Sequence, residues 1–293
     1  MINPQLDGKV VVITGANNPQ GIGASIAKAF AQQGAKVFIT YMRLPTSSDT
    51  DVPEPTEPGQ ALHDYGRAQN ADTVVQNIKD AGNTVEAWEA DLSDPATVPA
   101  LFDLVEQTFG SVDVLVHNAA YWEPNTFIPP TAKLHNEFST QWMDSAVGQI
   151  DAGMHDRIFA VNARATALLI AEFAKRHTQR SANWGRIITI STDSARCFPS
   201  EIAYGASKTA LESYSRSAAV ELGQFGITVN IVSPGPIQTG YITTEMEQSI
   251  NQNTPLGRVG YPDDIADVVV FLASEQGRWV SGQLIHVGGG HRM

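Results

Sequence analysis

The tyrosine and the lysine of the segment "YGASK" have a spacing that would suit proton transfer. Tyr204 and Lys208 are four residues apart, so in a helix they lie one turn apart on the same face. A free phenol has a pKa of about 10, and a nearby ammonium group favours the ionised form. Tyr204 could therefore serve as an acid or a base at a carbonyl or alcohol oxygen. Because the pattern is short and common, the pair could equally belong to an ordinary helix surface.

Two hydroxyl side chains precede this pair, directly after the apolar run "RIITI". Ser191 lies thirteen residues before Tyr204, and Thr192 follows it. In an open parallel sheet, ligands bind beyond the carboxyl ends of the strands, so either hydroxyl is placed to reach a ligand. The thirteen-residue spacing and the approach "FPSEIAY" favour Ser191 over Thr192.

A glycine-rich segment, "TGANNPQGIG" at residues 14–23, has the composition of a phosphate-binding loop. The apolar run at 9–14 predicts a buried strand before it, and apolar side chains spaced four apart predict a helix after it. Glycines allow a tight turn and let backbone amides approach a pyrophosphate, which the helix N-terminus also attracts. Five residues separate Gly15 from Gly21, which is not the usual spacing, so an ordinary turn is the alternative.

These residues need a scaffold, and the rest of the sequence predicts alternating strands and helices. Buried strands are predicted at 9–14, 35–40, 84–92, 112–120, 186–191, 227–235 and 283–290. Helical patterns occupy 22–34, 95–109, about 154–178, 203–224 and 262–274. This alternation predicts a Rossmann-type α/β fold, a doubly wound, mostly parallel, seven-stranded sheet with helices on both faces. No low-complexity segment divides the chain, so residues 1–293 are predicted to form one domain.

Composition and charge argue against several classes of function. The 293 residues carry a formal net charge of −12 and a pI near 4.9, which disfavours binding of nucleic acid or of an anionic membrane. Cys197 is the only cysteine, so we expect neither an internal disulfide nor a metal site. No run of residues reaches transmembrane length, and the N-terminus enters its first strand without a leader, which predicts a cytoplasmic protein.

The glycine loop, "HNAA" after the fourth strand, Ser191 and the pair of Tyr204 and Lys208 together resemble the short-chain dehydrogenase/reductase family. The similarity covers nearly the whole chain and includes "VNARATALL", "SPGPIQT" and "SGQLIHVGGG". Within this family, the sequence is most similar to the subgroup that has a TG-x-x-x-G-x-G loop, an N-N-A-G segment and the pattern Y-x-x-x-K, as in 3-oxoacyl-ACP reductases. Two departures stand out: "NNPQ" contains a two-residue insertion, and His117 and Ala120 replace the first Asn and the Gly of N-N-A-G. We expect His117 to be a buried strand-end residue rather than a metal ligand.

The resemblance implies a role for each matching residue. Tyr204 would be the general acid or base, and Lys208 would lower its pKa and hold the nicotinamide ribose. Ser191 would hydrogen-bond the substrate oxygen, and Asn162 would hold a water that links Lys208 to solvent. The implied cofactor-binding residues are Gly15, Asn17, Gly21, Ile22, Gly23, Tyr41, Arg43, Asp91, Leu92, Asn118, Ala119, Tyr204, Lys208, Pro234, Gly235, Ile237 and Thr239.

The choice of cofactor depends on the end of the second strand, "ITYMR". An acidic residue at this position binds the ribose 2′-hydroxyl of NAD. Tyr41 stands there instead, and Arg43 follows as a candidate partner for a 2′-phosphate, so NADP(H) is favoured over NAD(H). The neighbouring segment "SSDTDVPEPTEPG" is acidic, so Arg43 could also be a solvated charge.

Two segments are longer than the resemblance requires. Residues 44–67 are proline-rich, acidic and poor in large apolar side chains, which predicts a mobile excursion near the adenosine side. Residues 121–153 form an extended insertion on the substrate side, whose aromatic residues could wall a pocket, cover a subunit contact or pack locally. These aromatic residues are Tyr121, Trp122, Phe127, Phe138 and Trp142. Met246 and Ile250 could face the substrate or pack locally.

The leading hypothesis is an NADP(H)-dependent oxidoreductase that interconverts a ketone and a secondary alcohol by hydride transfer, as a 3-oxoacyl-ACP reductase-like enzyme or a carbonyl reductase. The alternatives are a non-catalytic NADP-binding regulatory or scaffold protein of the same fold, and an NAD-dependent alcohol or polyol dehydrogenase. Double-bond reduction is disfavoured, because enoyl reductases of the wider family space their Tyr and Lys farther apart. The expected partner is a small carbonyl or alcohol compound, and the resemblance implies a homotetramer.

Overall fold

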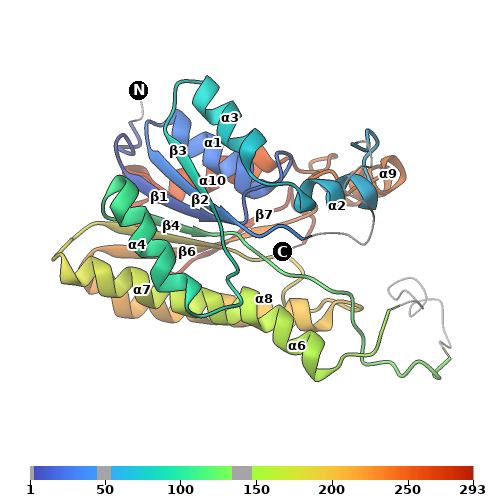
Figure 1. Cartoon of the computed structure of the whole chain (residues 1–293). Coiled ribbons are helices and arrows are strands. Elements are labelled where there is room, and N and C mark those ends of the chain that lie inside the picture. Colours follow the sequence, from blue (N-terminus) through green and yellow to red (C-terminus); the bar gives the residue numbers. More distant parts are fainter. Residues whose placement is uncertain (1–2, 45–53, 134–146, 293) are drawn as a thin grey trace.

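The computed structural model describes residues 3–44, 54–133 and 147–292, which form a parallel sheet covered by helices (Figure 1). Seven strands lie in the order β3-β2-β1-β4-β5-β6-β7, and all neighbouring pairs are parallel. The strands are β1 (Val10–Thr14), β2 (Lys36–Tyr41), β3 (Val85–Glu89), β4 (Val114–His117), β5 (Gly185–Ile190), β6 (Ile227–Pro234) and β7 (Leu284–Val287). The predicted doubly wound, seven-stranded α/β architecture is confirmed.

Helices pack on both faces of this sheet and form two apolar cores. One face carries α1 (Ile22–Gln32), α3 (Asp72–Asp80) and α10 (Pro262–Ala273). The other carries α4 (Thr97–Phe109), α7 (Ala165–Gln179) and α8 (Ile202–Leu222). The central strands β1, β4 and β5 are buried along their whole length because helices cover both of their faces. Their continuous apolar runs are therefore the reason that the sequence predicted them well.

Smaller helices lie at the ends of these layers. They are α2 (Gln60–Ala68), α6 (Ala152–Phe159), α9 (Thr244–Asn253) and two 3₁₀ turns, Gly223–Phe225 and Glu275–Gly277. A π-helical turn, Ala160–Arg164, joins α6 to α7, so the single helix predicted at about 154–178 is interrupted in its middle. The sequence did not predict α2, α3 or α9.

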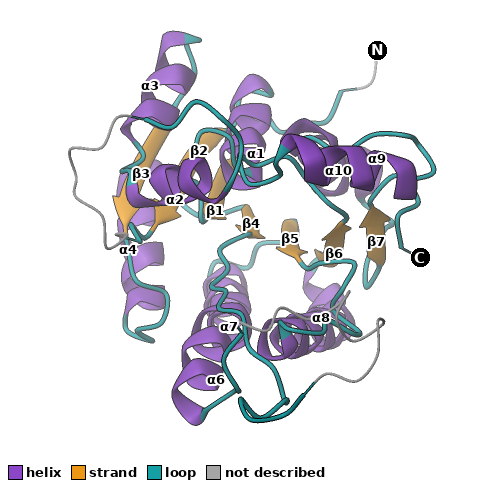
Figure 2. Cartoon of the chain, turned by 90° about the vertical axis from the view of Figure 1, so that its right-hand side faces the viewer, coloured by secondary structure: helices purple, strands orange, loops and turns teal. Residues whose placement is uncertain are grey.

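The segment 44–67, for which the sequence predicts a mobile excursion, contains most of helix α2 in its second half. Residues 45–53 lie outside the described part of the chain, as do Phe138 and Trp142 of the other long segment. Figures 1 and 2 show α2 at the carboxyl edge of the sheet, above the ends of β1 and β2.

The order of the strands also places the ligand site. The chain leaves β1 toward β2 on one side and returns to β4 on the other, which makes the β1/β4 boundary a topological switch point. The loops that follow β1 and β4 lie at the carboxyl edge of the sheet (Figure 2), where ligands of such folds bind. Within the described residues, no helix combines the length and hydropathy needed to cross a membrane.

Candidate active site

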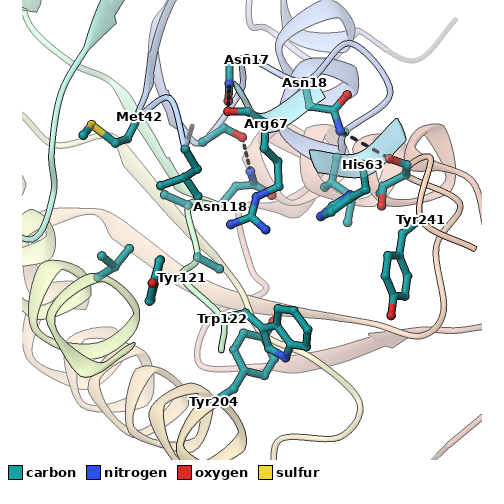
Figure 3. Close-up of a pocket in the computed structure, with 18 of the residues that line it drawn as sticks. Asn17, Asn18, Met42, His63, Arg67, Asn118, Tyr121, Trp122, Tyr204 and Tyr241 are labelled. Atoms are coloured by element: carbon teal, nitrogen blue, oxygen red, sulfur yellow. Dashed lines mark hydrogen bonds between the residues drawn. The ribbon is translucent and has the colours of Figure 1, made fainter. Parts of the chain in front are cut away.

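A cavity of about 750 Å³ occupies this carboxyl edge. Its wall is formed by the loops after β1 to β6 together with α2, the start of α8 and α9 (Figure 3). Of the predicted cofactor residues, those that line it are Gly15, Asn17, Gly21, Ile22, Tyr41, Asp91, Leu92, Asn118, Ala119, Tyr204, Ile237 and Thr239. The predicted site residues thus converge on one cavity, although seven of the predicted positions do not line it. Those seven are Gly23, Arg43, Asn162, Ser191, Lys208, Pro234 and Gly235.

The glycine loop forms a cradle that fits a pyrophosphate. Gly15 has a φ of +72°, and a Cβ placed on it would lie 2.7 Å from the Cα of Ala119, so only glycine is accommodated. A Cβ on Gly23 would overlap the carbonyl oxygen of Gly15, which explains why Gly23 supports the loop from behind. Helix α1 begins after Gly21 with no side-chain cap and no acidic residue in its first turn. Its N-terminal amides and dipole therefore suit an anion.

The "HNAA" segment fastens this cradle to β4. The Asn118 side-chain amide donates to the carbonyl oxygens of Thr14 at 3.0 Å and Gly15 at 2.8 Å. The Thr14 hydroxyl accepts from the backbone amides of Asn118 and Ala119, so its own proton is directed to Nδ1 of His117, 3.0 Å away. Burial, and then the charge of Lys208, lowers the pKa of His117 to about 3. His117 is a neutral, buried link between β1 and β4.

No group of His, Cys, Asp and Glu side chains in the described ranges could hold a metal ion.

Helix α8 brings Tyr204 to the cavity and keeps Lys208 behind the wall. The Lys208 ammonium donates to the carbonyl oxygen of Ile190 at 2.8 Å and lies 5.7 Å from the centre of the Tyr204 ring. Burial lowers the pKa of Lys208 to about 8.

The pKa of Tyr204 differs from the expectation. Burial raises the pKa of this phenol above its usual range, and the nearby Glu201 raises it further. The predicted lowering by Lys208 is not among the causes of its shift, because desolvation of the phenolate dominates. Tyr204 is therefore held as a neutral phenol, which is a proton donor.

Ser191 does not face the cavity, contrary to the prediction from its spacing. Its hydroxyl donates to the carboxylate of Glu212 in α8 at 2.7 Å, and the Thr189 hydroxyl likewise meets Ser215 of α8 at 2.9 Å. Side chains alternate along a strand, so Ser191 shares the α8 face with Thr189. Thr192, the residue judged less favourable from the spacing, lines the cavity.

Asn162 lies in the π-helical turn and connects two walls of the site. Its side-chain oxygen accepts from the backbone amide of Tyr121 at 2.7 Å. Its side-chain nitrogen donates to the Tyr121 carbonyl at 2.9 Å and to the Ser207 hydroxyl at 3.0 Å. Asn162 thus ties the loop after β4 to the residue that precedes Lys208, and the predicted water relay stays a prediction.

Tyr41, Asp91 and Leu92, which the sequence predicts at the adenosine end, all line the cavity. Arg43, in contrast, has its Nε within 2.9 Å of both carboxylate oxygens of Glu89 at the end of β3, and its side chain is 54% exposed. The guanidinium of Arg43, which the sequence suggested as a partner for a 2′-phosphate, is therefore paired with the carboxylate of Glu89 instead.

At the end predicted to bind the nicotinamide, the residues that line the cavity come slightly later in the sequence than expected. Pro236 lines the cavity together with Ile237 and Thr239, whereas Pro234 ends β6 and Gly235 donates its backbone amide to the carbonyl of Val287. Met246 and Ile250 of α9 also line the cavity, as the sequence allowed.

Two groups of cavity residues were missed by sequence reasoning. One consists of His63 and Arg67 of α2 with Asn18 of the loop. The other is Glu201, whose carboxylate accepts a hydrogen bond from the indole of Trp122. Burial raises the pKa of Glu201 to about 7. Its position three residues before Tyr204 was a signal that could have indicated it, and for α2 the signal was the helical spacing of two basic side chains.

Comparisons with known proteins agree with this geometry. The family described as "Enoyl-(Acyl carrier protein) reductase" matches residues 59–292. Versicolorin reductase stcU of Emericella nidulans is 32% identical over 305 residues, covering 98% of this chain and 97% of that protein. NADPH-dependent aldehyde reductase 2, chloroplastic, of Arabidopsis thaliana is 32% identical over 291 residues, covering 97% and 94%.

Solved structures show the same similarity. The crystal structure of a dehydrogenase/reductase from Sinorhizobium meliloti 1021 superposes with a TM-score of 0.77 at 28% identity, covering 99% of this chain and 98% of that one. The match spans the sheet, the glycine cradle and the helix that carries Tyr204. The chain therefore belongs to the short-chain dehydrogenase/reductase family and is an oxidoreductase that acts on C=O or CH–OH groups.

Proposed function

We propose that this protein is an NADP(H)-dependent carbonyl reductase that converts a ketone or an aldehyde to the alcohol, with Tyr204 as the proton donor. The observation that carries the proposal is the position of the Tyr204 phenol, which lines the same cavity as the glycine cradle. Burial and Glu201 keep this phenol protonated, which is the form that reduction of a carbonyl requires.

The chain's residues would divide the reaction between them. The nicotinamide dinucleotide, when bound, supplies the hydride that reaches the carbonyl carbon. Tyr204 donates its phenolic proton to the carbonyl oxygen, and Thr192 donates a second hydrogen bond to the same oxygen as charge develops there. The ammonium of Lys208 stabilises the phenolate that remains on Tyr204, because an opposite charge favours the ionised form. In the reverse direction the same phenolate would accept the proton of an alcohol.

The proposal of NADP(H) over NAD(H) rests on two observations and not on Arg43. Tyr41 stands at the end of β2, where an acidic residue would bind the 2′-hydroxyl of NAD and repel a 2′-phosphate. Two of the similar proteins, both from Arabidopsis thaliana, carry names that include NADPH dependence. The pair of Arg43 with Glu89 removes the argument that the sequence had suggested.

The substrate would bind between the nicotinamide end and α9. The wall there combines apolar side chains, among them Trp122, Met246 and Ile250, with the single carboxyl group of Glu201. Such a wall suits an apolar carbonyl compound that carries one hydrogen-bonding group. The reductase names of the similar proteins are consistent with this class.

The first experiment is a titration of the purified protein with NADPH and with NADH, followed by turnover of a panel of ketones and aldehydes. Absorbance of the nicotinamide reports turnover, and Tyr204→Phe is the variant. We expect Tyr204→Phe to lower kcat by about 10²- to 10⁴-fold, the usual contribution of a general acid, while NADPH affinity changes little. Turnover by the variant at the rate of the unaltered protein would contradict the assigned role of Tyr204.

A homotetramer is a proposal that rests on the resemblance, and a cytoplasmic location is a proposal that rests on the sequence. Light scattering on the eluate of a size-exclusion column would measure the mass of the assembly. A mass of one chain, about 31.5 kDa, would contradict the proposed tetramer.

A further inference from the structure

Helix α2 is held directly against the lengthened glycine loop. The side-chain amide of Asn17 donates to the carbonyl oxygens of Arg67 at 3.2 Å and Gln69 at 2.8 Å, at the C-terminus of α2. Helix and loop approach so closely that a Cβ on Gly66 would lie 2.7 Å from the side-chain oxygen of Asn18. The two-residue insertion in "NNPQ" therefore provides the surface on which α2 rests.

The other end of α2 reaches the segment that precedes α9. The backbone amide of Gly59 donates to the carbonyl of Gly240 at 2.8 Å, and the rings of His63 and Tyr241 lie 5.6 Å apart. Helix α2 thus spans the cavity from the glycine loop to the nicotinamide side.

The polar face of α2 forms part of the cavity wall, with Gln60 at its solvent-exposed end and His63 and Arg67 partly buried. Gln60, His63 and Arg67 lie three and four residues apart, so they share this face, and all three line the cavity. Figure 3 shows the guanidinium of Arg67 pointing into the cavity between Asn118 and His63.

Arg67 has no carboxylate partner within the part of the chain that the structure describes. Burial lowers its pKa, but a guanidinium in a protein stays charged. Arg157, which also lines the cavity, is paired with Glu123 at 2.6 Å. The carboxylate of Asp64, in the same helix, raises the pKa of Arg67 without forming a salt bridge with it, and burial outweighs this effect. A partly buried guanidinium that faces a cavity without a salt bridge favours binding of an anion.

We propose that Arg67 binds the pyrophosphate of the dinucleotide, so that α2 forms a second side of the phosphate site opposite the glycine cradle. This inference rests on the proposed function, because it assigns a ligand contact to the same cavity. The pyrophosphate is favoured over the 2′-phosphate because α2 rests on the glycine loop. Met42, beside the end of β2, lies away from the guanidinium in Figure 3.

The test uses two nucleotide probes that separate these phosphates. ADP-ribose carries the pyrophosphate without a 2′-phosphate, and 2′-AMP carries the 2′-phosphate without a pyrophosphate. Isothermal titration calorimetry of the full chain measures the Kd of each probe for the unaltered protein and for Arg67→Met. We expect Arg67→Met to raise the Kd of ADP-ribose by about 10- to 100-fold, the range of a charge-assisted hydrogen bond. The Kd of 2′-AMP should change by less than about twofold.

Two further variants keep the result interpretable. Arg278→Met removes an arginine whose side chain is 63% exposed and which pairs with Glu275 outside the cavity, so we expect it to leave both probes unchanged. Arg67→Lys keeps the charge but cannot bind two oxygens in one plane, so we expect a smaller loss of ADP-ribose affinity than for Arg67→Met. This second variant keeps the test available if Arg67→Met unfolds.

The outcomes separate the inference from the proposed function. An unchanged Kd for ADP-ribose in the Arg67 variants, or a loss confined to 2′-AMP, overturns the inference alone. Failure of the unaltered protein to bind ADP-ribose, NADPH or NADH overturns the proposed function and the inference with it.

Discussion

The placement of the two hydroxyl groups after β5 predicts opposite effects for two conservative substitutions. Thr192→Val keeps the size of a side chain that lines the cavity but removes the donor proposed for the carbonyl oxygen. Loss of one donor to a developing oxyanion lowers kcat by about 10²- to 10³-fold. The hydrogen bond that this substitution removes, from the Ser194 backbone amide to the Thr192 hydroxyl, is long at 3.4 Å, so we expect the melting temperature to change by less than about 2 °C.

Ser191→Ala acts on stability instead. It removes a 2.7 Å hydrogen bond to the buried carboxylate of Glu212, which retains the guanidinium of Arg216 at 3.3 Å. A hydrogen bond to a charged group contributes about 1.5–3 kcal/mol, and the remaining partner places the loss toward the lower value. For a chain of this size that corresponds to a fall of roughly 3–6 °C in melting temperature. We expect kcat to change by less than about threefold.

The assay measures kcat at saturating NADPH and carbonyl substrate, together with the thermal unfolding of the same preparations. We expect Thr192→Val to change kcat and Ser191→Ala to change the melting temperature, each with little effect on the other measurement. If Ser191→Ala lost turnover by the larger factor while Thr192→Val retained it, the assignment from strand alternation would be refuted.

Three further predictions concern pH, cofactor choice and α2. Because burial lowers the pKa of Lys208 to about 8, its ammonium is present below that pH, and we expect kcat/KM for reduction to fall as the pH rises through about 8. A separate change near pH 7 should belong to Glu201 and disappear in Glu201→Gln, and pH–rate profiles that coincide for the two proteins would contradict this. Tyr41→Asp should shift the ratio of Kd values toward NADH by about tenfold or more, since a carboxylate binds the 2′-hydroxyl and repels a 2′-phosphate; fluorescence titration with both cofactors would show an unchanged ratio if the position is wrong. Gly66→Ala should weaken binding of either dinucleotide, because its Cβ would lie 2.7 Å from Asn18, and equal affinities in the same titration would show that the contact is not needed.

The sheet could be predicted from the sequence because its central strands are buried on both faces. Runs such as "VVVIT" of β1 and "GRIITI" of β5 contain few polar residues, and burial by two helical layers is the reason. The convergence of Tyr204 with the glycine loop followed from the same order of strands. Helix α2 could not be predicted in this way, because only Leu62 and Gly66 of it are buried. Its remaining contacts are with a loop and a cavity, and neither produces an apolar stripe.

The choice between Ser191 and Thr192 shows a second limit. Spacing to Tyr204 counts residues in the connecting loop, whose path the sequence does not specify. The direction of a side chain depends instead on the strand, where a shift of one residue exchanges its two faces. The alternation of side chains that begins with Thr189 places Ser191 on the α8 face and Thr192 toward the cavity. It is therefore a better basis for choosing between them than the spacing to Tyr204.

The lengthened loop and helix α2 are best understood as one feature. A nine-residue helix is marginal on its own, and its last carbonyl groups need donors from outside the helix. Asn17, within the lengthened loop, supplies such a donor to Arg67 and Gln69, and Asn18 packs where Gly66 leaves room. Without the loop, α2 would lose this anchor and its cap. Without α2, the buried amide of Asn17 would lose both of its acceptors.

The shared result of these contacts is a guanidinium placed inside the cavity, and this arrangement has a cost. Burial disfavours the charge of Arg67, the carboxylate of Asp64 offsets only part of this effect, and no carboxylate in the described residues forms a salt bridge with the guanidinium. Two insertions that cooperate to hold a partly buried guanidinium without a salt bridge are difficult to explain as packing, since an apolar side chain would serve packing better. An anionic ligand that offsets the charge when it binds accounts for both insertions at once, and the pyrophosphate above the neighbouring cradle is such an anion.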